Sequence, residues 1–208
     1  MKGLLLKDIY MTVKYCRVYI LISLFFTVFS LYEKGHLFFV FYPCLLCGMI
    51  PVNLLGYDER SGWVRYSETM PYTRSQIVSA KYLIGLGAQL IILLITGISQ
   101  AVQMSIGGTF SLTEYLVLMM LLLTMSLVAS SLTLPFIFKL GVEKGRMAYY
   151  IMIGIVSAVC VIISNLSADS LIPQAMPDIL LPAICLIGIG IYTLSWYLSV
   201  VFYRKREI

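Results

Sequence analysis

Apolar residues in this chain gather into six long runs, separated by short polar segments. Most runs have the roughly 17–25 residues that a helix needs to cross about 30 Å of hydrocarbon. The first run is the shortest, and we expect it to take residues from its flanks. The expected spans are approximately residues 18–32, 37–55, 82–104, 115–138, 148–166 and 179–203. The pattern predicts an all-α membrane protein with six transmembrane helices, in a single domain over residues 1–208.

Basic residues indicate how these spans are oriented. The chain has 15 Lys and Arg residues, and if the N-terminus is cytosolic all except Lys34 fall on the cytosolic side. This asymmetry is the positive-inside signal, and it predicts that both termini are cytosolic. The chain is 60% hydrophobic and 12% charged, against about 25% charged residues in soluble domains. Its net charge of +5 therefore indicates membrane orientation and some attraction to anionic lipid, not binding to nucleic acid.

Residues 1–17 precede the first span and are not apolar enough to cross the membrane. The apolar positions of one helical face are Leu6, Ile9, Val13 and Cys16. The charged positions of another face are Lys7, Asp8 and Lys14. This pattern predicts a helix that lies in the plane of the membrane interface. The alternative is a frayed extension of the first span.

The longest cytosolic loop covers residues 57–79, between the second and third spans. Thr73-x-x-Gln76 is a capping box and predicts a helix from about Arg74, just as Ser111-x-x-Glu114 predicts the start of the fourth span. Pro71 ends whatever precedes it, which leaves room after Gly56 for about two turns of amphipathic helix.

Within that segment Trp63 and Tyr66 form one aromatic edge, flanked by Arg60 and Arg65. Aromatic side chains beside Arg are typical of protein contact surfaces, but an aromatic belt at the lipid headgroups fits the same composition. The shorter cytosolic loop, residues 139–147, carries Glu143 and Lys144. It is either a second contact point or a solvated turn.

Four polar residues of the third span fall on one stripe: Gln89, Thr96, Gln100 and Gln103. Polar groups in hydrocarbon must find partners. The stripe therefore either lines a translocation path or holds neighbouring helices together, the more common use of such residues. Pro43, Pro51 and Pro135 predict kinks in the second and fourth spans.

Residues that could carry catalysis or bind a metal are scarce. Cys44-x-x-Cys47 lies in the second span without a second pair to relay electrons, so we expect inert thiols. The lone His36 has no partner for hydrolytic or zinc chemistry. We expect no catalytic residues, no metal site and no cofactor bound by this chain.

One run of residues resembles a known family. The run comprises Asp58-Glu59-x-Ser61-Gly62-Trp63, Tyr66, and Thr69-x-Pro71-x-x-Arg74-x-x-Ile77-Val78-x-x-Lys81-Tyr82. It is similar to the cytosolic loop of small ABC-2 type permeases, the membrane subunits of bacterial ABC exporters such as those for phenol-soluble modulins. The six-span layout with an N-terminal interfacial helix fits the same family. The resemblance covers the whole chain in layout, but only this run in motif.

The resemblance implies a transport subunit of the bacterial plasma membrane that is not itself an enzyme. The chain lacks the phosphate-binding pattern Gly-x-x-x-x-Gly-Lys-Ser/Thr, so a separate ATPase subunit would bind ATP and Mg²⁺. A second permease copy or a paralogue would complete a dimer, and amphipathic peptides or other hydrophobic compounds would be the cargo. The residues expected to couple to the ATPase are Asp58, Glu59, Arg60, Trp63, Arg65, Tyr66, Pro71, Arg74, Glu143 and Lys144. The alternatives are a membrane scaffold or immunity protein of the same fold, and a carrier that works without an ATPase.

Overall fold

The computed structural model describes residues 2–32, 37–67, 69–108, 111–145 and 180–205, together with the isolated positions 147, 150, 151 and 154. Over these residues the regular structure is entirely α-helical, which confirms the predicted all-α class. The helices are α1 (Lys2–Tyr15), α2 (Arg17–Tyr32), α3 (Leu37–Gly48), α4 (Ile50–Arg60), α5 (Trp63–Ser67), α6 (Arg74–Ile106), α7 (Leu112–Leu140) and α9 (Leu180–Lys205).

Four helical segments within the described residues are long and apolar enough to cross a membrane: Phe39–Arg60, Arg74–Ile106, Leu112–Leu140 and Cys185–Lys205. A fifth is added if α1 and α2, which bend by 65° at their junction, count as one broken span. The structure thus supports four or five spans where the sequence predicted six. The expected fifth span, residues 148–166, lies almost wholly outside the described residues. Residues 167–178, which the six-span prediction assigns to an outer loop, lie wholly outside them.

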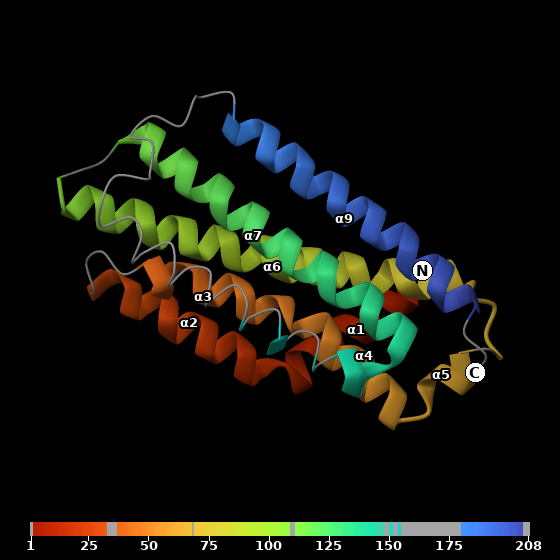
Figure 1. The fold of residues 1–208 in the computed structure, drawn as a ribbon. Helices are drawn as coiled ribbons and strands as arrows, with labels where there is room; N and C mark the ends of the chain where they lie inside the picture. Colours follow the sequence, from red (N-terminus) through yellow and green to blue (C-terminus); the bar gives the residue numbers. More distant parts are fainter. Residues whose placement is uncertain are drawn as a thin grey trace.

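The helices form an elongated bundle with the connections gathered at its two ends (Figure 1). α7 and α9 lie side by side along α6, whereas α2 and α3 pack together on the other side of the bundle. The start of α1, the end of α9 and the short helix α5 all lie at one end, and the α6–α7 connection lies at the other (Figure 1). This arrangement brings together the segments that the basic residues predicted to be cytosolic.

Helix α6 begins well before the expected third span, because its N-terminus is capped in the loop that was predicted to be cytosolic. The Thr73 hydroxyl accepts from the Gln76 amide and the Gln76 side chain accepts from the Thr73 amide, so the predicted capping box is confirmed. Ser111 likewise accepts from the Glu114 amide at 3.4 Å at the start of α7. The early start of α6 places Lys81 inside the helix, not in a loop before it.

The second span is one unit interrupted at Met49, between α3 and α4. Pro51 sits in the first turn of α4, where its missing N–H costs least. The helix then continues past the predicted end of the span at residue 55 to Arg60. Pro43 and Pro135 lie inside α3 and α7.

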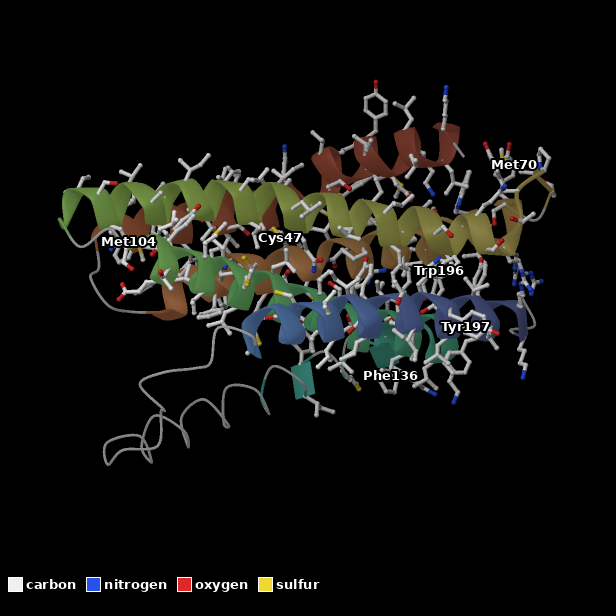
Figure 2. All side chains as sticks on the ribbon, turned by 90° about the horizontal axis from the view of Figure 1, so that it is seen from above. Cys47, Met70, Met104, Phe136, Trp196 and Tyr197 are labelled. Atoms are coloured by element: carbon white, nitrogen blue, oxygen red, sulfur yellow. The ribbon has the colours of Figure 1, made fainter. Side chains whose placement is uncertain are left out.

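Residues 2–15 form a separate helix, as the sequence predicted, and not a continuation of α2. Its apolar positions Leu6, Ile9 and Val13 are exposed, and Figure 2 shows α1 lying across one face of the bundle with side chains pointing outward. Lys7 and Asp8 turn toward the bundle instead of toward water, unlike the polar face that the pattern predicted.

Candidate functional site

The predicted amphipathic helix between the second and third spans is shorter than expected. α4 runs to Arg60, a turn at Ser61 and Gly62 follows, and α5 is a helix of five residues, not of two full turns. Gly62 has φ of 69°, a left-handed conformation that side chains with a Cβ disfavour, so the chain breaks its helix there. α5 is consequently not a continuation of α4, but a separate short helix at the end of the bundle (Figure 1).

Helix α5 carries the predicted aromatic pair. The Trp63 and Tyr66 ring centroids lie 5.6 Å apart with a tilt of 54°. Tyr66 is 55% exposed and Trp63 is half-buried, with the Lys7 ammonium 3.9 Å from the Trp63 ring centroid. Arg60 and Arg65 are exposed on either side. Trp63 is therefore packed against Lys7, whereas the Tyr66 ring is accessible at the surface.

The second loop predicted to be cytosolic adjoins the first. The Val142 amide donates to the Glu59 carboxylate at 3.3 Å, and Val142 packs in a small apolar cluster with Met49, Val52 and Ile137. Glu143 and Lys144 follow Val142 directly and are exposed. The structure thus brings both predicted contact loops together at one end of the bundle, although they lie about 80 residues apart in the chain.

Asp58 lies away from this exposed surface. Its carboxylate is 2.7 Å from the Lys7 ammonium and 2.6 Å from the Lys81 ammonium. Lys81 also lies 2.7 Å from Asp8, which is 3.5 Å from Lys7. We call these four residues the ion cluster: Lys7, Asp8, Asp58 and Lys81. Asp58 could therefore contribute to coupling only through contacts inside the permease, because its buried carboxylate is not accessible to a partner protein.

The side chains of Asp8, Asp58 and Lys81 are almost fully buried, and Lys7 is 23% exposed. Burial, together with the neighbouring Lys81 ammonium, lowers the pKa of Lys7. Sequence reasoning missed the cluster because its members come from three separate segments. The one signal was Lys81, a charged residue directly before an apolar run and behind a capping box.

Arg74 and Pro71 occupy different environments. Pro71 is exposed in the loop before α6. The Arg74 guanidinium donates to the carbonyls of Tyr203 at 3.3 Å and Arg204 at 3.1 Å, in the last turn of α9, where carbonyls no longer have a partner within the helix. Arg74 thus ties the start of α6 to the end of α9.

The polar stripe of α6 meets neighbouring helices of the same chain. The Gln89 amide donates to the Ser126 carbonyl at 2.8 Å and to the Ser130 hydroxyl, both in α7. Gln100 and Gln103 donate to the hydroxyl and the carbonyl of Ser30 in α2, at 3.3 and 2.8 Å. The Thr96 hydroxyl donates within α6, to the Ile92 carbonyl at 2.8 Å. These contacts favour the packing interpretation, and a role in a translocation path stays a prediction.

Cys44 and Cys47 are buried free thiols in α3. Figure 2 shows Cys47 near the middle of the bundle. Among the residues that the structure describes, no three His, Cys, Asp or Glu side chains are grouped in a way that could hold a metal ion.

Comparison with known sequences identifies the family. The profile of the ABC-2 family transporter proteins matches residues 3–204, nearly the whole chain. No curated protein and no solved structure matches the chain. Proteins of this family are permease components of ABC transporters, lack an ATPase domain of their own, work with an ABC ATPase and typically assemble as dimers. The chain therefore belongs to the ABC-2 family of transporter proteins, as a multi-pass membrane permease.

Proposed function

We propose that this permease is the transmembrane subunit of an ATP-driven exporter of the bacterial plasma membrane, with six spans and both termini in the cytosol. A separate ATPase subunit binds ATP and Mg²⁺ and supplies the energy. Two permeases, identical or paralogous, form the pathway. The cargo is an amphipathic peptide or another hydrophobic compound, a class that fits a chain with 60% hydrophobic residues and short outer loops.

The observation that carries this proposal is the surface at one end of the bundle. There the exposed edge of Trp63 and Tyr66 lies at the same end as the loop with Glu143 and Lys144, and Glu59 bonds directly to that loop. An aromatic pair flanked by Arg60 and Arg65 has the composition of an anchor that fills a cleft on a protein partner. We assign α5 and this adjoining loop as the docking surface for the ATPase.

The test is the double variant Trp63→Ala with Tyr66→Ala. Truncating an aromatic anchor commonly costs about 2 kcal/mol or more, roughly 30-fold in affinity. We expect the variant to lose its ATPase in pull-down experiments, or to uncouple ATP turnover from export. Insertion into the membrane should survive, because the spans are unchanged.

The matched control is Trp196→Ala with Tyr197→Ala, which removes the same residue types from exposed positions of a different helix, α9 (Figure 2). It should keep the ATPase and export at the level of the unmodified protein. If Trp63 and Tyr66 only anchor α5 to lipid headgroups, the first variant keeps the ATPase as well, and the assignment of the docking surface is wrong.

The alternatives make different predictions. A membrane scaffold or immunity protein would not stimulate ATP turnover in any complex. A secondary carrier would move cargo in vesicles that contain the permease alone. Reconstitution with and without an ABC ATPase subunit separates all three.

A further inference from the structure

The ion cluster joins three segments that are far apart in the sequence. Lys7 and Asp8 come from α1, Asp58 from the end of α4, and Lys81 from the third turn of α6. Each of the three segments contributes to at least one short ion pair, at 2.6 or 2.7 Å. The cluster is therefore a fixed junction between the N-terminal helix, the segment that leads into α5, and the longest span.

Stability alone is a weak reason for such a junction. Charges buried this deeply lose their hydration, and well-packed apolar residues commonly stabilise a protein as well or better. The two lysines and two aspartates balance in charge, but Asp8 Oδ2 has no hydrogen-bond partner among the described residues. The best-attested use of buried charges is to fix one arrangement of elements against its alternatives.

Lys7 extends this junction to the surface. Its ammonium lies 2.7 Å from Asp58 Oδ1 and 3.9 Å from the centroid of the Trp63 ring. It is the most exposed member of the cluster, and it lies between the buried charges and the exposed aromatic edge. A second contact between the same elements is the stacking of Tyr15 on Tyr57, with ring centroids 4.4 Å apart.

We propose that Lys7 is a positioning residue that holds Trp63 in place for the ATPase and links α5, through the ion cluster, to α1 and α6. This inference rests on the proposed function, because it gives the docking surface its mechanical connection to the spans. When the partner moves α5, the ion pairs carry the movement to α1 and α6, because breaking them in a buried site is costly.

The first test follows Trp63 in the permease alone. The chain has two tryptophans, so Trp196→Phe leaves Trp63 as the single fluorescent reporter. In this background we expect Lys7→Met to shift the emission of Trp63 and to increase its quenching by acrylamide. The conformation of Trp63 seen in the unmodified protein should become about tenfold less populated. That change is within the range for loss of a partly desolvated cation–π contact. Lys7→Arg should restore both signals, because guanidinium keeps the ion pair and the ring contact.

The second test uses the complex with the ATPase. We expect Lys7→Met to lower the ATP turnover that accompanies export about tenfold, and Lys7→Arg to recover it. Lys2→Met is the matched control, because it makes the same change at an exposed lysine at the other end of the same helix, and it should leave all signals unchanged.

If Lys7→Met fails to assemble, Lys7→Met with Asp58→Asn replaces it in both tests. This variant removes one charge of each sign and keeps the buried pair of Lys81 and Asp8. It should assemble and still release Trp63. An unchanged Trp63 signal would overturn the inference, and so would a released Trp63 with fully coupled ATP turnover. If the unmodified permease binds no ATPase, the proposed function fails, whereas the fluorescence test still decides whether Lys7 positions Trp63.

Discussion

Lys81 shows at the scale of one residue how the fold compensates for a buried charge in an apolar helix. Its side chain is 1% exposed, and its ammonium group is shared between Asp8 and Asp58 at 2.7 and 2.6 Å. Without those partners, the desolvated ammonium would be far less favourable than it is in water. The reverse also holds, because two buried carboxylates depend on Lys81 for compensation.

Substituting Lys81 should therefore destabilise the protein strongly. Lys81→Met leaves Asp8 without its shortest ion pair, and breaking a buried pair in this way costs about 3–5 kcal/mol. Thermal unfolding of the detergent-solubilised permease measures the loss. Lys139→Met, at an exposed lysine near the end of α7, is the control and should change little. Equal melting temperatures for the two variants would argue against a buried ion cluster.

At the scale of helices, hydroxyl and amide groups connect α6 to three neighbours, α2, α7 and α9. Gln89 bonds to α7, while Gln100 and Gln103 bond to the same residue of α2, Ser30. Nearer the start of α6, the Tyr82 hydroxyl lies 2.7 Å from those of Ser195 and Ser199 in α9. Such bonds specify which helix faces which, because apolar packing in lipid is less selective.

The contacts with Ser30 can be tested by changing Gln100 and Gln103 together to Leu. Interhelical hydrogen bonds in membranes average about 0.6 kcal/mol, so the double variant should lose about 1 kcal/mol of stability. Gln100→Leu and Ser30→Ala should be less than additive in a double-mutant cycle, since they remove the same bond. If export changes while the melting temperature does not, the stripe lines a path. If neither changes, both interpretations fail.

At the scale of the whole molecule, the two ends of the bundle differ in chemistry. The termini and the loops with Arg60, Arg65 and Lys144 lie at one end, and the α6–α7 connection lies at the other (Figure 1). In a membrane this polarity predicts which end faces the cytosol.

Cysteine labelling tests this orientation in a background without native cysteines. A cysteine at Gly107, which is exposed beyond α6, should react with an impermeant reagent from outside. Cysteines at Ser61 and Lys144, both exposed, should react only after the membrane is opened. Lys144 is preferable to Gly145, because a Cβ at Gly145 would lie 3.0 Å from the Ile137 backbone. Labelling at position 61 from outside would reverse the assigned orientation and remove the docking surface from the cytosol.

The sequence by itself determined the helical membrane class, the cap at Thr73, the separate N-terminal helix and the pairing of Trp63 with Tyr66. Each of these depends on neighbours within a few turns, and apolar periodicity, capping residues and i, i+3 spacing report such local relations directly. The break between α4 and α5 could have been foreseen only from Gly62, whose left-handed backbone interrupts the helix there.

Only the tertiary structure decided where the polar residues of separate segments meet. In sequence Asp58 belongs with Glu59, yet one carboxylate is buried against Lys81 and the other bonds to the Val142 amide. Lys7 and Asp8 look like a solvated face, but the packing of α1 against α6 turns them inward. The local pattern cannot distinguish a charge that meets water from one that meets an opposite charge, because the partner lies 51 or 73 residues away along the chain.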